Sequence, residues 1–442
     1  MGSRRPPFAA RRPTGYNPIR ALCLDAKLRL RGACVNFRRY DPTKDRDAVL
    51  RIWWETGWLK EGKEEAVDDL LGAGQTFVAD IGDSPECAVA IVPGSLRYMD
   101  EELPFAGVAA VATSYVARKQ GLARRLTAHS LAGAAADGAL VAGLGAFDLG
   151  FYDALGFGTG VYEHIARFDP ATLKVSVRPR VPRRLSLDDT PAIHASRLAR
   201  RRRHGSLNFP PLALSRGEMV EHGGFGLGYA DGPDGALTHH LWCVPANREM
   251  GPYRILWLAY QTPAQFLELM ALVRSWGDQV LLVQMREPPD IQIQDLLEHP
   301  FHTRRATRGS DMENFMAANA YWQMRICDLP GCLARTHLPW GQVRFNLRLS
   351  DPIEPYLGEG AGWRGVGGDY VVTLGPSSAA ERGMDPSLPT LSATVNAFTR
   401  LWLGVQPASA LTATDALSGP EELLRNLDAV LRLPTPHPDW DF

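Results

Sequence analysis

Short apolar runs and longer amphipathic stretches alternate along the first part of the chain. Runs rich in Val, Ala, Ile and Phe predict strands at residues 35–40, 76–80, 88–92, 108–112, 140–144 and 161–168. Longer stretches predict helices at residues 44–58 and 122–136, the second of them rich in Ala and Leu. This order predicts a mixed α/β unit with antiparallel strands at its front, which the strand at 161–168 is expected to close.

Two further segments follow a Pro-containing, basic stretch near residues 170–182. The second segment predicts strands at 228–230, 241–244, 254–260 and 280–283 and a helix at 263–276. The third predicts strands at 343–349 and 370–374, a Gly-rich loop at 357–368 and helices at 392–403 and 420–431. Because the second segment repeats the order of the first, we expect a second copy of the same architecture.

Length and composition limit the classes of protein that this chain can belong to. Its 442 residues fit about three domains of ~150 residues each. A net charge of −1 gives no reason to expect nucleic acid as a partner, and no apolar run approaches the ~18 residues of a membrane span. Six cysteines without a CxxC pair predict reduced thiols, a cytoplasmic location and no structural zinc site.

The first 34 residues are basic and interrupted by proline, which breaks any helix. They also lack the apolar core of a secretory signal. Three interpretations remain open: a disordered extension, a start codon placed too early, or an organelle transit peptide. Ordered structure is expected from Val35 onward.

The run Arg118-Lys119-Gln120-Gly121-Leu122-Ala123 lies between the strand predicted at 108–112 and the helix predicted at 122–136. Gly121 lets the backbone come close to a ligand. The free N–H groups and the positive end of the helix dipole would then face a phosphate. The run therefore predicts an anion cradle, and the alternative is an ordinary surface turn before a helix.

Several motifs resemble those of known acetyltransferases. The spacing Arg118-x-x-Gly121-x-Ala123 is similar to the pyrophosphate-binding segment of the GNAT superfamily, and Phe151-Tyr152-x-x-x-Gly156-Phe157-Gly158 resembles its signature Y-x-x-x-G-F. Later segments resemble the Eis-type (enhanced intracellular survival) acetyltransferases. These are Trp322-x-x-Arg325-Ile326, residues 401–404, 408–411 and 423–430, and the ending Asp439-Trp440-Asp441-Phe442.

The resemblance implies an α+β (mixed α/β) chain of tandem GNAT folds followed by a sterol-carrier-protein-like domain. Residues 1–34 would be an N-terminal extension and 35–176 the catalytic GNAT domain. Residues 177–303 would be a second GNAT-like domain without a cradle, and 304–442 the sterol-carrier-protein-like domain, whose end reaches the active site. Members of the family are often hexameric, so a homo-oligomer is expected.

The resemblance also implies acetyl-CoA as the co-substrate and no metal. The residues expected to bind the pyrophosphate are Arg118, Lys119, Gln120, Gly121, Leu122, Ala123 and Arg124. Backbone N–H groups of Val111, Ala112 and Thr113 would bind the pantetheine arm and the thioester oxygen, and Phe147 and Asp148 would line that arm. The pair His239-His240 lacks a third ligand at metal spacing.

Two residues are candidates for the proton transfers of acetyl transfer. Tyr152 is the expected general acid, because a phenol with a pKa near ~10 can protonate a thiolate. In the family the C-terminal carboxylate acts as the base, which implies that role for Phe442; the alternative is a frayed terminus. An α-carboxyl with a pKa near ~3.5 is a poor base unless burial raises that pKa or a water relays the proton.

The function predicted is direct acetyl transfer to the primary amine of a small cationic acceptor of the aminoglycoside, polyamine or lysine type. Asp439 and Asp441 would suit a positive charge, and Glu55, Trp53, Trp54 and Trp58 would lie either in the core or at the acceptor pocket. The run of residues 200–204 is expected to be a solvated helix end. The alternative function is a non-catalytic protein that binds acyl-CoA or lipid with its third domain.

Overall fold

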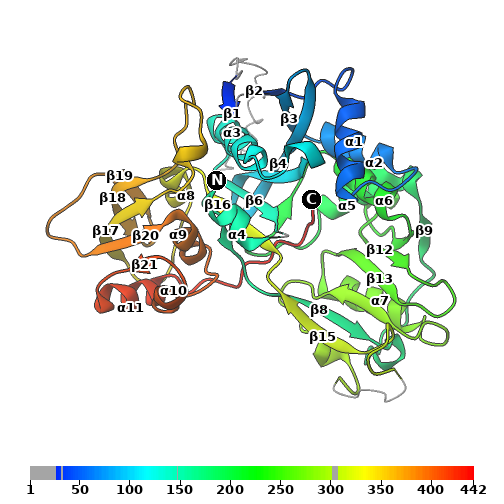
Figure 1. Ribbon diagram of the computed structural model, residues 1–442. Helices are drawn as coiled ribbons and strands as arrows, with labels where there is room; N and C mark the ends of the chain where they lie inside the picture. Colours follow the sequence, from blue (N-terminus) through cyan, green and yellow to red (C-terminus); the bar gives the residue numbers. More distant parts are fainter. Residues whose placement is uncertain (1–25, 31–32, 147, 301–306) are drawn as a thin grey trace, which may run out of the picture.

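The computed structural model describes residues 26–30, 33–146, 148–300 and 307–442, which form three β-sheets with helices packed on them (Figure 1). The fold is mixed α/β, which confirms the class predicted from the sequence. In Figure 1 the first sheet lies in the upper centre, the second at the lower right and the third at the left. In the described part of the chain, no helix is long and apolar enough to cross a membrane.

The first sheet has the strand order β1-β2-β3-β4-β5-β6-β16-β7, and β10 pairs with β4 off this path. Its strands are β1 (Ala26–Leu30), β2 (Ala33–Arg39), β3 (Gln75–Ile81), β4 (Ser84–Tyr98), β5 (Glu101–Thr113), β6 (Val141–Gly145), β7 (Gly158–Thr159), β10 (Leu207–Asn208) and β16 (Trp322–Ile326). The helices around it are α1 (Arg46–Thr56), α2 (Glu64–Gly72), α3 (Leu122–Ala136) and α4 (Leu149–Asp153).

Helices cover both faces of this sheet. Along β4, the side chains of Cys87, Val89 and Ile91 belong to the core that contains α3, whereas Ala88 and Ala90 belong to the core that contains α1. Successive side chains of a strand point to opposite faces, so both sets are buried. This explains why the strands are continuous apolar runs in the sequence and not alternating ones.

The second sheet has the order β15-β8-β14-β13-β12-β11-β9. Its strands are β8 (Glu163–Phe168), β9 (Arg183–Leu185), β11 (Phe225–Tyr229), β12 (His239–Pro245), β13 (Tyr253–Ala259), β14 (Val283–Arg286) and β15 (Phe315–Asn319). Its helices are α5 (Thr190–Leu198), α6 (Leu212–His222) and α7 (Pro263–Arg274). A capping box between Thr262 and Gln265 begins α7, whose apolar residues pack in the core of this sheet.

The third sheet has the order β19-β18-β17-β20-β21. Its strands are β17 (Val343–Ser350), β18 (Gly368–Leu374), β19 (Ala379–Arg382), β20 (Thr390–Thr394) and β21 (Leu417–Ser418), and its helices are α8 (Leu329–Ala334), α9 (Val395–Trp402), α10 (Ala408–Thr414) and α11 (Glu421–Val430). Its helix α9 packs on the first sheet, where Tyr98 of β4 stacks on Trp402 at 4.4 Å and donates a hydrogen bond to its carbonyl oxygen. Its assignment to the sterol-carrier-protein type stays a prediction, as do the domain boundaries.

Two strands lie in sheets other than those the sequence suggests. The strand expected to close the first unit is β8, and it pairs with β14 and β15 in the second sheet. In its place β16, from the start of the third segment, pairs antiparallel with β6 and β7. Periodicity identifies a strand but carries no information on its partner, so this exchange between sheets could not be predicted.

Three other expectations differ from the structure. Ordered structure begins before Val35, because the backbone of β1 pairs with β2 from Ala26 onward; residues 1–25 lie outside the described residues. The helix predicted at 392–403 is strand β20 followed by α9, because the Thr394 side chain caps a helix that begins at Val395. Helices α2, α4, α6, α8 and α10 were not predicted.

Candidate active site

The predicted anion cradle is a sharp turn between β5 and α3. Gly121 is the N-cap of α3 with a left-handed backbone (φ 78°), and Lys119 also has a positive φ of 60°. Arg118, Lys119 and Gly121 are exposed. The first N–H groups of a helix have no partner within it, so this turn presents donors and the positive helix end to one place. These features fit a bound pyrophosphate.

The side chains of two expected members of the cradle, Leu122 and Arg124, pack against other parts of the protein. Leu122 is 1% exposed and packs in the core, so it can contribute only its backbone. The Arg124 guanidinium lies over the rings of Phe151 and Tyr356, with centroids at 5.2 and 5.3 Å. Its place between two aromatic rings connects α3 to α4 and to the loop before β18.

An opening between two parallel strands lies beside the cradle. Strand β5 pairs with β6 only at Phe105, Ala106 and Gly107, although β5 continues to Thr113. A bulge against β4 coincides with the positive φ of Ala110 (55°). In the described residues, the last part of β5 therefore has a strand partner on one side only. This unpaired edge includes the predicted Val111, Ala112 and Thr113.

Tyr152 lies on α4 and is buried beside β4. Its side chain is 2% exposed and packs edge-on against Phe157 at 6.1 Å. Burial, with a smaller contribution from Cys87, raises the pKa of Tyr152 well above that of a free phenol. The phenol therefore stays protonated at neutral pH, as a proton donor must.

Of the two residues predicted to line the pantetheine arm, the structure describes one. Asp148 is exposed and caps α4, since its carboxylate accepts a hydrogen bond from the Gly150 N–H at 3.1 Å. Phe147 lies outside the described residues.

The C-terminal arm crosses from the third sheet to the space between the first and second sheets (Figure 1). Arg200 clamps it by two hydrogen bonds to the Asp439 carboxylate, at 2.8 and 2.6 Å. Trp440 is 2% exposed, lies over the Arg197 guanidinium at 3.9 Å and donates its ring N–H to Glu218. The arm is thus fixed by buried contacts, unlike the frayed end that chain termini usually form.

Arg200 and His204 are buried, contrary to the prediction from the sequence. The run at 200–204 was expected to be a solvated helix end, yet Arg200 is 8% and His204 4% exposed. The His204 ring connects the Met99 N–H to the Leu403 carbonyl, at 3.1 and 3.0 Å. Burial lowers the pKa of His204 to about 4, so the ring is neutral at physiological pH. The run serves to dock the arm and the third segment.

Phe442 lies at the root of the opening between β5 and β6. Its ring packs on Phe209, with centroids 4.6 Å apart, and edge-on against Phe105 at 6.0 Å. A Cβ atom on Gly107 would come within 2.8 Å of the Phe442 ring, so only glycine fits there. Gly107 is also the last residue of β5 that pairs with β6. The structure therefore brings Phe442 to the place where the two strands separate.

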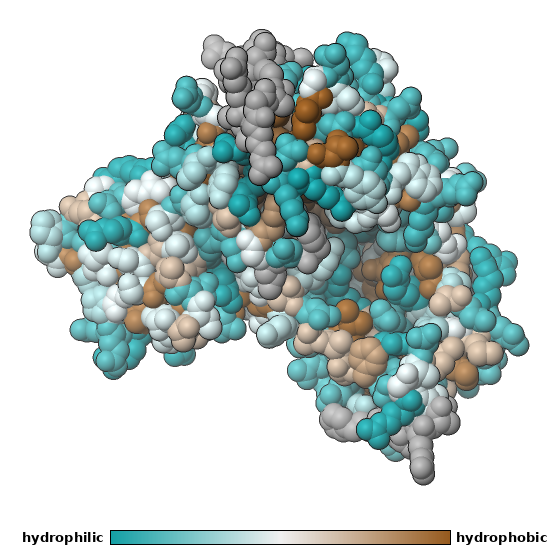
Figure 2. Space-filling model, viewed as in Figure 1, coloured by the Kyte–Doolittle hydropathy of each residue, from teal (hydrophilic) through white to brown (hydrophobic). Residues whose placement is uncertain are grey.

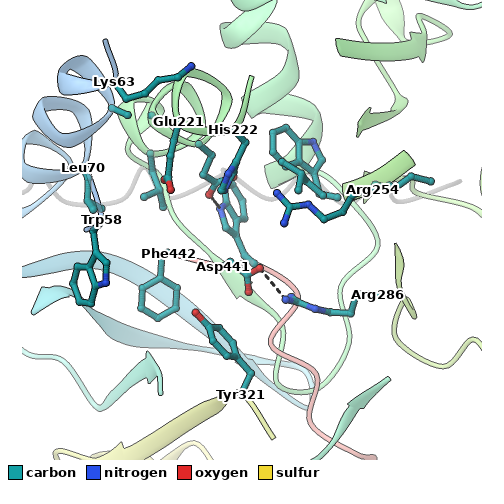
Figure 3. A pocket seen from close by; sticks show the side chains of 18 of the residues that line it. Trp58, Lys63, Leu70, Glu221, His222, Arg254, Arg286, Tyr321, Asp441 and Phe442 are labelled. Atoms are coloured by element: carbon teal, nitrogen blue, oxygen red, sulfur yellow. Dashed lines mark hydrogen bonds and ion pairs between the residues drawn. The ribbon is translucent and has the colours of Figure 1, made fainter. Parts of the chain in front are cut away.

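A cavity of about 490 Å³ adjoins Phe442 (Figure 3). Its walls come from α1, α2, α6, β13, β14 and the arm, and the space-filling view shows a hollow with apolar residues on its walls in this region (Figure 2). Trp53 and Trp58 line it, which supports a pocket position for this pair. Trp54 and Glu55 do not line it, and Glu55 accepts a hydrogen bond from the Tyr115 N–H.

The segment that carries the cradle resembles a known protein domain. Residues 37–160 match the model of an acetyltransferase (GNAT) domain. This chain contains a GNAT acetyltransferase domain. The match covers the cradle, the opening between β5 and β6, and Tyr152, so the chain is an enzyme of the acyltransferase class.

Solved structures resemble the whole chain in fold. Eis1 from Mycobacterium abscessus has a TM-score of 0.68 at 16% identity, and the alignment covers 92% of this chain and 100% of that one. GCN5-related N-acetyltransferases from Kribbella flavida and Anabaena variabilis have TM-scores of 0.71 and 0.74 at 19% and 14% identity, covering 93% and 92% of this chain and 99% and 100% of theirs. None of the curated proteins matches the chain in sequence. The likeness supports the tandem, Eis-type architecture.

The cradle of the GNAT domain gives a test with a matched control. Gly121→Val forces a β-branched residue into a left-handed conformation, which costs about 1–2 kcal/mol, and we expect CoA binding to weaken by about fivefold or more. Gly82, in the turn between β3 and β4, also has a positive φ and no atom within 4 Å of an added Cβ. Titration calorimetry should show unchanged CoA binding for Gly82→Val; equal binding by both variants would contradict the cradle.

A buried carboxylate near the arm was not predicted. Glu163, at the start of β8, is 6% exposed and lies 3.4 Å from Arg286, which also pairs with Asp441. Burial raises the pKa of Glu163 to about 7, despite the positive charge of Arg286. The sequence around Glu163 did not predict a buried carboxylate, because the neighbours of Glu163 come from β14 and the C-terminal arm, which are distant in sequence.

The raised pKa of Glu163 predicts how stability depends on pH. Since the folded protein binds this proton more tightly than the unfolded chain, Glu163 contributes stability that is complete below pH 4.5 and is lost as pH rises through about 7. Glu163→Gln removes this titration. Denaturant unfolding at pH 5 and pH 8 should show that the variant gains free energy of unfolding relative to the wild type as pH rises, and a pH-independent difference would refute the prediction.

One cluster in the second sheet has the spacing of metal ligands. Ligand atoms of Asp231, His239 and Glu268 lie within 4.8 Å of one another. Arg180 donates hydrogen bonds to both carboxylates at 2.7–2.8 Å, and together with His239 it lowers the pKa of Glu268 to about 2. The cluster is thus an ion-pair network organised by an arginine.

Proposed function

We propose that this chain is an acetyl-CoA-dependent N-acetyltransferase that transfers acetyl directly to a primary amine. The observation that carries the proposal is the position of Phe442, packed on Gly107 at the point where β5 and β6 stop pairing. The chain terminus and the cavity for the acceptor adjoin each other there, and the proposed cofactor-binding edge of β5 begins beyond Gly107.

The main chain around the cradle and β5 would hold the co-substrate. N–H groups at 119–124 would bind the pyrophosphate, with added charge from Arg118 and Lys119. The edge of β5 at 111–113 can donate backbone hydrogen bonds to the pantetheine amides and to the thioester oxygen, as an added strand would. When bound, acetyl-CoA supplies an activated acyl group with a good leaving group.

Two groups of the chain would transfer protons, the Phe442 carboxylate and the Tyr152 hydroxyl. The main-chain carboxylate of Phe442 would accept the proton that the attacking amine loses, directly or through a water. The Tyr152 hydroxyl would donate a proton to the sulfur as the carbon–sulfur bond breaks. Each such transfer by a positioned group contributes about 10²–10⁴ in rate.

The acceptor would enter from the cavity. Aromatic walls such as Trp58, Trp257 and Tyr321 suit an aliphatic amine with a positive charge. Of the acceptors considered from the sequence, these features support a small amine of the polyamine, aminoglycoside or lysine type. Oligomerisation stays a prediction.

Release of the CoA thiol from acetyl-CoA in the presence of a panel of amines tests this proposal. The panel contains polyamines, an aminoglycoside, lysine and short monoamines. We expect thiol release with at least one amine, with an equal amount of N-acetylated product by mass spectrometry. Tight CoA binding without turnover of any amine would indicate a binding protein and refute the proposal.

A further inference from the structure

The charged groups that line the acceptor cavity do not balance. Most of its acids are already paired: Glu218 with Arg197 and Asp439 with Arg200, both at 2.6 Å, and Asp441 with Arg286 at 2.8 Å. Hence Asp439 and Asp441 do not offer the free negative charge expected from the sequence. Among the described lining residues, Glu221 is the side-chain acid without an ion pair, and the terminal carboxylate of Phe442 adds a second negative charge.

Several cations of the same cavity have no acidic partner. The guanidinium of Arg254 makes no ion pair or hydrogen bond with any described residue and is exposed. Lys60 has no ion pair within the described residues, and Lys63 donates only to the Val220 carbonyl oxygen at 2.7 Å. Three cations thus face two negative charges, those of Glu221 and of the Phe442 terminal carboxylate, and a negatively charged ligand would balance the excess.

Arg254 is placed to act inside the cavity. It lies on β13 opposite Gln284 of β14, and Arg286 follows two residues later on the same face of β14. Arg254 and Arg286 are therefore diagonal neighbours, and Figure 3 shows both guanidinium groups directed toward the arm. Arg286 is neutralised by Glu163 and Asp441, whereas Arg254 is not.

His222 lies between Arg254 and Lys60 on one side of the charge balance and Glu221 and Asp441 on the other. Burial lowers the pKa of His222, and this is the largest effect on it. A neutral imidazole leaves Arg254 as the cation of this wall with five free donors in a planar fork, the geometry that matches a carboxylate or phosphate.

We propose that the acceptor of the proposed acetyl transfer carries an anionic group besides its amine, and that Arg254 binds this group. The inference rests on the proposed function and narrows its substrate class to amines with a carboxylate or phosphate. The amine would lie toward Phe442 and the anion toward β13, since both line one cavity. A polyamine has no group for Arg254 and would place its second amine against that cation.

Matched pairs of amines test the inference. Lysine and cadaverine differ only in the carboxylate, and phosphoethanolamine and ethanolamine only in the phosphate. In the wild-type protein we expect kcat/KM to be at least about tenfold higher for the anionic member of one pair, as for a charge-assisted hydrogen bond. Arg254→Gln should remove this preference, so that both members of the pair are acetylated with similar kcat/KM.

A second arginine serves as the control. Arg184, on the edge strand β9, is exposed and lies outside the cavity, and Arg184→Gln should keep the full preference. If amines are acetylated but neither anionic member is preferred, or the preference survives Arg254→Gln, the inference is wrong while the proposed function stands. If no amine is acetylated, the proposed function itself fails and the inference fails with it. The pair that shows the preference identifies the anion.

Discussion

Removal of Phe442 is expected to lower kcat/KM for amine acetylation by about a hundredfold or more, with CoA binding unchanged. The deletion leaves Asp441 as the last residue, so the terminal carboxylate retreats by one residue from Gly107 and from the opening between β5 and β6. A loss of this size is typical for a displaced general base. Steady-state kinetics with the amine that the wild type acetylates best, together with CoA titration, measures both quantities.

Two further variants separate the carboxylate from the ring. One added glycine after Phe442 keeps the ring on Phe209 but moves the carboxylate, and should be as slow as the deletion. Phe442→Leu keeps a carboxylate and an apolar anchor, and should retain most of the activity. If the deletion or the extension turns over at the wild-type rate, the terminal carboxylate is not the base.

Tyr152→Phe should lower kcat by about 10²–10³ with little change in the KM for acetyl-CoA. The ring would keep its packing against Phe157, so the fold is retained, and the loss is confined to the hydroxyl that donates the proton. An effect on kcat without one on KM identifies an interaction made in the transition state.

Tyr98→Phe provides the matched control for Tyr152. Tyr98 is another fully buried phenol, and its hydroxyl donates to the Trp402 carbonyl oxygen at 3.0 Å. Its removal should cost about 1 kcal/mol of stability and leave kcat unchanged. Equal kcat values for the Tyr152→Phe variant and the wild type would exclude Tyr152 as the acid.

Local features of the site could be predicted because each is encoded within a short stretch. The helix predicted at 122–136 is α3, and the glycine before it has the left-handed conformation that a cradle needs. The motif around Tyr152 likewise folds as a unit, since Gly156 supplies the positive φ after α4. The assignment of roles to Tyr152 and Phe442 came from resemblance and still depends on the variants above.

The acceptor cavity could not be predicted, because its residues come from segments far apart in sequence. Arg254 and Arg286 become neighbours only through the parallel pairing of β13 with β14, and Glu163 joins them because β8 belongs to the second sheet. The basic run at 200–204 appears solvated in the sequence, yet Arg200 is buried by the arm that it binds. The charge of this cavity therefore depends on which distant strands pair with one another.

A crystal structure of the chain with CoA and the preferred amine tests the central claim most directly. We predict that the pyrophosphate contacts the backbone at 119–124, that the pantetheine follows the free edge of β5, and that the sulfur lies between Tyr152 and the carboxylate of Phe442. A sulfur bound elsewhere, or an amine held away from Phe442, would contradict the account.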